Sequence, residues 1–147
     1  MASRRRAREF ALQALYQTDV GQTTVQDALQ ALWAGLVEET EDELGKRQAE
    51  SDEIEFATAI GVGVQDNQTE LDTRIEASST NWRVPRMSVI DRNILRMGTF
   101  ELSHMPEVPA NVSINEAIEL AKRFGTKDSK GFVNGILDRI ARDLGRV

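Results

Sequence analysis

The sequence predicts an all-α protein of six or so helices. Apolar residues recur at helical spacing through most of the chain, and strand-like alternation never lasts more than a few residues. Only 3 of the 147 residues are proline and 40% are hydrophobic, which suffices for the core of a single domain of this length. Because aromatic residues make up only 5%, leucine, isoleucine, valine and alanine must do most of the packing.

Start signals mark the first two helices. Ser3 is a suitable N-cap for a helix that runs to about Thr18, and Gly21 follows it. Thr24 followed by Asp27 resembles a capping box and starts a second helix. The apolar arc of the first helix consists of Ala7, Phe10, Ala11, Ala14 and Leu15. The corresponding residues of the second helix are Ala28, Leu29, Leu32, Trp33 and Leu36.

A strongly acidic segment comes next. Residues 38–55 hold nine acidic and two basic side chains, so this segment carries more negative charge than the whole chain, whose net charge is −6. We expect a solvated loop or the charged start of a helix there, and the rest of the chain is slightly basic. A third helix is predicted from about Ser51 to Ala77. Gly61 and Gly63 weaken it, which close approach of another helix would explain.

The clearest break in the pattern is "SSTNWRVPR" at 78–86, where a proline joins several turn-forming residues. After it, Ser88 and Asp91 cap a fourth helix, and two prolines fix a loop at 104–111. The break therefore divides the predicted helices into two groups.

Two more helices complete the prediction. Ser113 with Glu116 forms a third capping box and opens a short helix that ends at Phe124, with Gly125 as its C′ residue. The last helix covers about 129–144.

Asn134-Gly135 lies inside that last helix and by itself favours a hairpin turn. Helical spacing of the apolar residues nevertheless continues across this dipeptide. We therefore interpret it as part of a helix with an internal glycine, which usually has a packing or functional reason.

Composition excludes several classes of function. The absence of cysteine rules out disulfides, zinc–thiolate sites and thiol catalysis, and a single histidine, His104, argues against a histidine-based metal site or triad. There is no glycine-rich phosphate loop and no nucleophile–base spacing, so we expect no enzymatic activity, no metal and no cofactor. No stretch approaches the roughly 20 apolar residues of a membrane span, and we expect a cytoplasmic protein without membrane contact.

The chain begins with an unusual cluster of positive charge. Its members are Arg4, Arg5, Arg6 and Arg8. Each cation in the first turn of a helix costs a few tenths of a kcal/mol or more, because the macrodipole makes that end partly positive. Guanidinium groups bind phosphate, and Tyr16, on one stripe with Arg5 and Arg8, can stack on a base. This placement favours RNA or DNA binding. The alternative is a solvated basic end, neutralised by Glu9 or by the acidic segment.

Other basic residues follow later in the chain. Those around the break and the fourth helix are Arg83, Arg86, Arg92 and Arg96, which by themselves more often form a solvated face. Lys127 and Lys130 lie beside a helix N-terminus, where backbone N–H groups can bind phosphate. Phe132 follows them and is a candidate for stacking or partner contact, although a core phenylalanine is an equally good interpretation.

Three segments resemble one known family. They are "RRRAREFALQALYQ" at the start, "IDRNILRMGTFEL" at 90–102 and "VSINEAIELAKRFGTKDSKGFVNGILDRI" at 112–140. Together they closely resemble the NusB family of transcription antitermination factors, and the third segment is highly specific. The similarity covers essentially the whole chain and is weakest over 20–80.

The resemblance implies a compact helical domain over 1–147, with six to seven helices arranged as two three-helix subdomains. Their expected bounds are about 1–77 and about 81–147. It also implies a non-catalytic role. NusB proteins bind the boxA sequence of nascent ribosomal RNA together with NusE, a small-subunit ribosomal protein. That complex joins other Nus factors on RNA polymerase and keeps transcription processive.

The resemblance also assigns residues. The implied RNA-binding set is Arg4, Arg5, Arg6, Arg8, Tyr16, Lys127, Lys130 and Phe132. The implied partner-binding set is Asp91, Arg92, Arg96, Asp128 and Phe132. A competing hypothesis is a non-catalytic dimerisation or protein-interaction module, whose RNA surface is weak or masked by the acidic segment. A homodimer through the arginine-bearing face is compatible with both. NusB-like domains also occur fused to RNA cytosine methyltransferases, but this chain ends about where the domain does.

Overall fold

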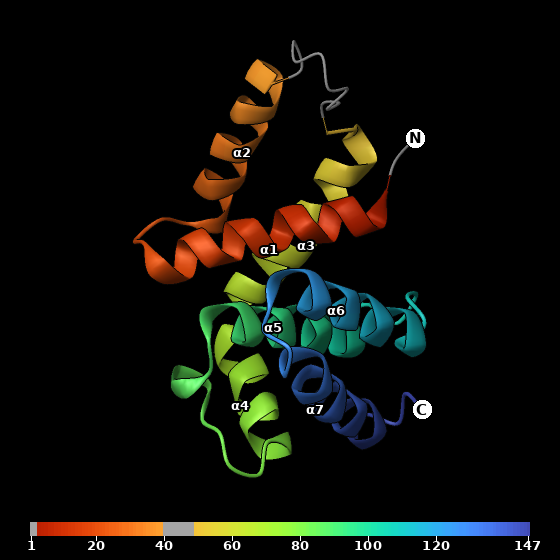
Figure 1. Ribbon diagram of the computed structural model, residues 1–147. Coiled ribbons are helices and arrows are strands. Elements are labelled where there is room, and N and C mark those ends of the chain that lie inside the picture. Colours follow the sequence, from red (N-terminus) through yellow and green to blue (C-terminus); the bar gives the residue numbers. More distant parts are fainter. Residues whose placement is uncertain (1–2, 40–48) are drawn as a thin grey trace. The chain divides into compact units, whose positions relative to one another are not determined.

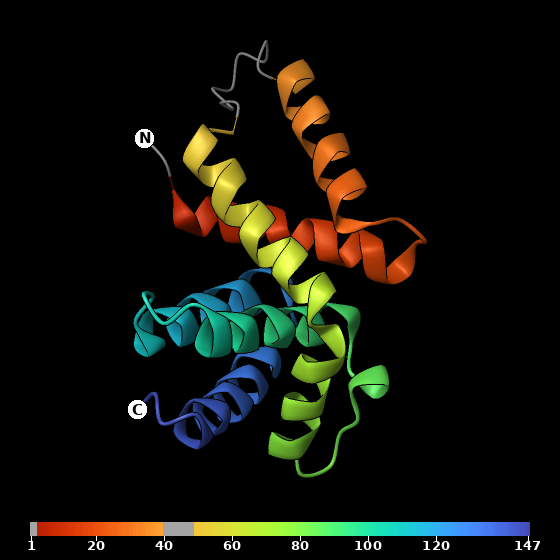
Figure 2. The same cartoon turned by 180° about the vertical axis from the view of Figure 1, so that it is seen from behind.

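A computed structural model of the chain describes residues 3–39 and 49–147. Within these ranges it contains seven α-helices, one short 3-10 helix and no strand (Figures 1 and 2). The predicted all-α class is confirmed. The chain forms two compact units, Met1–Gly63 (unit 1) and Val64–Val147 (unit 2). Half of the acidic segment 38–55, residues 40–48, lies outside the described residues.

Unit 1 is built from the first three helices. They are α1 (Arg4–Val20), α2 (Val25–Glu39) and α3 (Ser51–Asp66), the last of which extends three residues into unit 2. Both predicted N-caps are confirmed. The Ser3 hydroxyl accepts the N–H of Arg6 at 3.1 Å, and the Thr24 hydroxyl accepts the N–H of Asp27 at 3.1 Å.

A glycine in unit 1 lets two helices approach closely. A Cβ placed on Gly61 of α3 would lie 2.8 Å from Cγ1 of the fully buried Val25 on α2. The predicted close approach at Gly61 is therefore confirmed. Phe10 of α1 and Trp33 of α2 add an edge-to-face contact, with ring centroids 5.1 Å apart.

Unit 2 is organised around one central helix. Its elements are α4 (Gln68–Ser78), the 3-10 helix η1 (Val84–Arg86), α5 (Val89–His104), α6 (Ala110–Phe124) and α7 (Ser129–Asp143). α5 packs against α4, α6 and α7, and every residue from Asn93 to Leu102 is buried. Such all-round burial is what a helix enclosed by three others requires.

The predicted third helix over 51–77 is wrong in one respect, because it is two helices. α3 ends at Asp66, and Asn67 leaves helical geometry with φ −117° and ψ 18° before α4 begins. Leu71 and Ile75 of α4 are fully buried, and α4 packs on α5. The two units are divided between Gly63 and Val64, within α3. Unit 2 contains α4 in addition to the three helices predicted after the break at 78–86.

The predicted start of the helix that ends at Phe124 is also corrected. α6 begins at Ala110, with Pro109 as its N-cap, one turn before the predicted cap Ser113. Ser113 is 1% exposed, and its hydroxyl donates to the carboxylate of Glu101 on α5 at 2.8 Å. Because that carboxylate is itself buried, the hydroxyl satisfies a polar group in the core instead of capping a helix.

Two glycines of unit 2 behave differently from their predicted roles. Gly125 ends α6 as predicted, but its φ of −92° is not the left-handed conformation of a C′ glycine. A Cβ there would instead collide with the side chain of Ser129, which accepts the N–H of Thr126 at 2.9 Å. Gly135 is helical as predicted, yet a Cβ on it would meet nothing within 4 Å, so packing does not require a glycine.

Candidate nucleic-acid interface

A buried carboxylate ties the first turn of α1 to the start of α3. The side chain of Glu53 is 0% exposed, and its Oε1 lies 3.1 Å from Nη1 of Arg6. The same carboxylate accepts the backbone N–H of Ser3 at 2.8 Å and that of Glu50 at 3.0 Å. Three donors on one buried carboxylate provide the partners that a buried charge requires.

An aromatic ring holds two more of the arginines. The guanidinium carbons of Arg4 and Arg8 lie 4.5 Å and 5.1 Å from the ring centroid of Phe56, which is 8% exposed. A cation over an aromatic face is stabilised by about 0.5–2 kcal/mol, depending on its exposure. Phe56 and Glu53 together offset part of the cost of collecting positive charge at a helix N-terminus.

The arginines differ in their access to solvent. Arg4 and Arg5 are exposed, the side chain of Arg6 is 22% exposed, and Arg8 is 3% exposed. The predicted stripe of Arg5, Arg8 and Tyr16 is therefore interrupted. Tyr16 remains exposed, whereas burial removes Arg8 from the surface that a ligand can reach.

The predicted alternative of a neutralised basic end is confirmed for Arg6. Its partner Glu53 belongs to the acidic segment 38–55, 47 positions along the chain. In the sequence the acidic segment is a candidate partner only as a whole, and neither Glu53 nor Phe56 stands out. No local spacing signals a contact over such a separation, so only the packing of α3 on α1 identifies these two residues.

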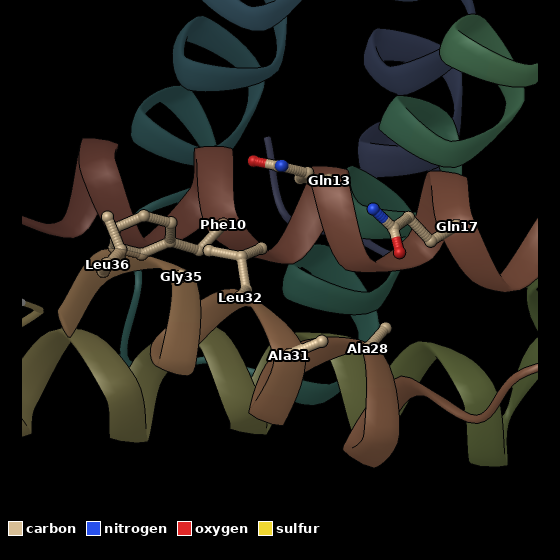
Figure 3. A pocket seen from close by; sticks show the side chains of 8 residues that line it. All are labelled: Phe10, Gln13, Gln17, Ala28, Ala31, Leu32, Gly35 and Leu36. Atoms are coloured by element: carbon tan, nitrogen blue, oxygen red, sulfur yellow. The ribbon is translucent and has the colours of Figure 1, made fainter. Parts of the chain in front are cut away.

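A groove of about 270 Å³ lies between α1 and α2. Figure 3 shows its lining, in which the apolar side chains of Phe10, Leu32 and Leu36 gather at one end and the amides of Gln13 and Gln17 extend from α1. The lining offers apolar contact with two polar groups and no charge, which suits a protein or peptide better than a polyanion.

A second group of exposed cations lies in unit 2. Lys127, Asp128 and Lys130 are all exposed around the N-terminus of α7. Phe132, one turn into the helix, is half-buried, and its ring centroid lies 6.4 Å from that of Trp82. Trp82 is 51% exposed and was not singled out from the sequence, although it stands in the predicted break.

Arg92 belongs to a residue set that was predicted to face a partner. It is half-buried, and its guanidinium donates to the carbonyl groups of Pro85 and Met87 at 3.4 Å and 3.3 Å, which holds the η1 segment against α5. Asp91, in the first turn of α5, is also half-buried. These contacts give Arg92 a structural role in the loop before α5.

Arg96 is a core residue of unit 2. It is 6% exposed, and its guanidinium binds the carboxylate of Asp72 through two hydrogen bonds of 2.8 Å and 3.1 Å. A third bond of 3.1 Å reaches the side chain of Asn93. The interpretation of Arg92 and Arg96 as one solvated face is therefore wrong for Arg96, whose side chain cannot face a partner while α4 covers it.

Two further features limit the chemistry of the described residues. Across 3–39 and 49–147, no three His, Asp or Glu side chains come together as metal ligands. None of the helices in these ranges combines the length and the hydropathy that a membrane crossing requires.

The fold and these surfaces define a small all-α protein that presents exposed cations at two helix N-termini. The sequence profile of the NusB family matches residues 5–142, and the chain belongs to this family. It is 47% identical over 146 residues to transcription antitermination protein NusB of Myxococcus xanthus, with 99% of each chain covered. It is 44% identical over 144 residues to the protein of that name from Geotalea daltonii, covering 98% and 97%. The predicted resemblance is confirmed.

Solved structures agree with this assignment. NusB from T. maritima superposes with a TM-score of 0.83 at 36% identity, covering 97% of this chain and 94% of that one. A chain from a crystal structure of NusB and NusE in complex with dsRNA superposes with a TM-score of 0.79, covering 95% and 96%. The sequence identity to that chain is 24%, so this similarity shows that the two chains share a fold.

Proposed function

We propose that this protein is a transcription antitermination factor that binds boxA of nascent ribosomal RNA together with NusE and supports processive transcription. The exposure of Arg4 and Arg5 carries the proposal. Both residues are exposed on the first turn of α1, where the macrodipole disfavours positive charge, whereas Arg8 is buried and only 22% of the Arg6 side chain is exposed. A phosphate backbone supplies negative charge to the exposed members of this cluster.

The proposed RNA contacts follow from exposure. Arg4, Arg5, Lys127 and Lys130 are exposed cations for phosphates, and the exposed Tyr16 and half-buried Phe132 offer rings for bases. Arg6 is a secondary contact, because 22% of its side chain remains accessible beside Glu53. Arg8 acts through packing on Phe56 and is not proposed as a contact.

The proposed partners are proteins as well as RNA. The proposed NusE contacts are Asp128, which is exposed, and Phe132 and Asp91, which are half-buried. The NusB–NusE complex with dsRNA contains a chain of this fold. We further propose that the protein joins other Nus factors and RNA polymerase without catalysing a reaction. A factor that acts on nascent transcripts is expected in the cytoplasm.

Fluorescence anisotropy with labelled boxA RNA tests the proposal. We expect binding that strengthens when purified NusE is added, exceeds binding to a scrambled strand, and weakens as salt rises. Equal affinity for boxA and scrambled RNA, with and without NusE, would overturn the RNA assignment.

The groove between α1 and α2 supports a second candidate, a dimerisation or protein-interaction module. Its apolar lining suits a protein contact, and Leu32 lies in its wall. Sedimentation velocity of the free protein and of its Leu32→Glu variant tests this function. A dimer that the variant disrupts, and that boxA RNA leaves intact, would favour the module over the RNA-binding factor.

A further inference from the structure

The geometry points to Trp82 and Phe132 as a stacking platform for one nucleobase of single-stranded RNA. This inference rests on the proposed RNA-binding function and adds to it a residue, Trp82, that no sequence motif indicated. The two rings come from separate elements of unit 2, the loop 79–83 and the first turns of α7. Their centroids lie 6.4 Å apart with an interplanar angle of 82°.

The exposure of Trp82 is unusual for so large an apolar side chain. It is 51% exposed, although tryptophan is mostly buried in folded proteins. In an edge-to-face pair one ring directs its edge at the face of the other, so Phe132 cannot cover both faces of the indole. Trp82 therefore keeps aromatic surface available to a ligand.

The loop that carries Trp82 is held in place by hydrogen bonds. The backbone N–H of Trp82 donates to the hydroxyl of Ser79 at 3.2 Å, and the N–H of Val84 donates to the carboxylate of Glu76 at 2.8 Å. Val84 itself is 2% exposed and anchors the end of the loop in the core. A ring presented on a fixed backbone loses little conformational entropy when a base stacks on it.

Charge around the pair favours RNA over a protein as the occupant. Exposed cations lie close to each ring in sequence: Arg83 and Arg86 follow Trp82, and Lys127 and Lys130 precede Phe132. Residues 76–86 and 126–132 contain two acidic side chains. Asp128 is exposed, and Oε2 of Glu76 lies 4.0 Å from Nε of Arg83. Surfaces that bind single-stranded nucleic acids typically combine aromatic rings with an excess of positive charge. The bases stack on the rings, and the phosphates bind the cations.

Fluorescence of a single indole tests the stacking directly. The chain has two tryptophans, so Trp33→Phe leaves Trp82 as the reporter and Trp82→Phe leaves Trp33 as the matched control. We expect boxA RNA to quench the emission of Trp82 and to leave that of Trp33 nearly unchanged. Quenching of neither indole by RNA that does bind would overturn the platform and leave the proposed function standing.

Affinity provides the second readout. Trp82→Ala should weaken boxA binding about 10-fold, whereas Trp82→Phe retains most of the affinity because a ring remains. The salt dependence of binding should be the same in both variants, since no phosphate contact is lost, and should fall in Lys130→Ala. Circular dichroism confirms folding, and Trp82→Phe supplies the comparison if the alanine variant unfolds.

Two further outcomes distinguish a failure of the stacking platform from a failure of the proposed RNA-binding function. Wild-type protein that binds no boxA RNA, even with NusE, would overturn the proposed function and the platform together. If Trp82→Ala binds RNA alone as tightly as wild type but loses NusE, the pair is a protein-docking site and the nucleobase platform is wrong.

Discussion

Glu53 and Arg6 form an ion pair of 3.1 Å in which the carboxylate is 0% exposed and the guanidinium-bearing side chain 22% exposed. The pair joins a helix start to a residue 47 positions away, and the backbone of Ser3 adds a second bond to the same carboxylate. The first turn of α1 is thereby held in one position relative to α3. Arg4 and Arg5, which we propose to bind phosphate, are exposed residues of this turn.

Loss of this carboxylate should destabilise unit 1. We expect Glu53→Ala to lower the free energy of unfolding by about 3 kcal/mol, because it leaves a guanidinium and two backbone N–H groups without their acceptor. Urea denaturation monitored by Trp33 fluorescence in a Trp82→Phe background measures it. The exposed neighbour Asp52 is the control, and Asp52→Ala should cost less than about 1 kcal/mol. Equal effects of the two substitutions would contradict the role given to Glu53.

The exposed and buried arginines should differ in their effect on RNA binding. Arg5→Ala should reduce the slope of log affinity against log salt by about 0.7, the contribution of one single-strand phosphate contact. Arg8→Ala should instead lower stability, because it removes a buried side chain from the ring of Phe56. Anisotropy titrations over a salt series measure the slopes. A larger slope change for Arg8→Ala than for Arg5→Ala would show that burial does not decide which arginine meets RNA.

Two helical glycines should respond in opposite directions to alanine. Gly135→Ala should raise the free energy of unfolding by about 0.5–1 kcal/mol, since the new methyl group meets nothing within 4 Å and alanine favours the helix. Gly98→Ala should lower it by about 1 kcal/mol. Its Cβ would lie 2.6 Å from Cδ1 of the fully buried Leu137, and overpacking outweighs the gain in helix propensity. Thermal or urea unfolding of both variants measures these changes in the free energy of unfolding. Stabilisation by both substitutions would contradict the close packing of α5 on α7.

Two Arg–Asp pairs of unit 2 provide a comparison of buried and exposed charge. Arg96→Ala should cost about 3 kcal/mol, because its guanidinium is buried and binds Asp72 bidentately. Arg142→Ala should cost less than about 0.5 kcal/mol, since its 3.2 Å contact with Asp138 is exposed on α7. Chemical denaturation measures both. If the Arg96 variant unfolds like wild type but loses NusE binding, Arg96 is a partner contact after all.

Local patterns were sufficient for most helices of the fold. Ser3, Thr24 and Ser88 cap helices where the sequence predicts it, since a capping hydroxyl and its N–H partner lie within three residues of each other. The break at Asn67 and the early start of α6 were missed. In both places local signals are weak, and burial of Leu71 on α5 or of Ser113 against Glu101 decides the outcome.

By itself the sequence determined the helical class, the resemblance to the NusB family and the collection of arginines at the start of the chain. Periodicity, caps and motif spacing are properties of neighbouring residues, so they can be read without a structure. Only the tertiary structure decided which arginines reach solvent, because Glu53 and Phe56 come to α1 from a helix about fifty residues away. It likewise brought Trp82 to Phe132 and buried Arg96 under Asp72, since contacts between distant segments depend on how helices pack and leave no periodic trace in the sequence.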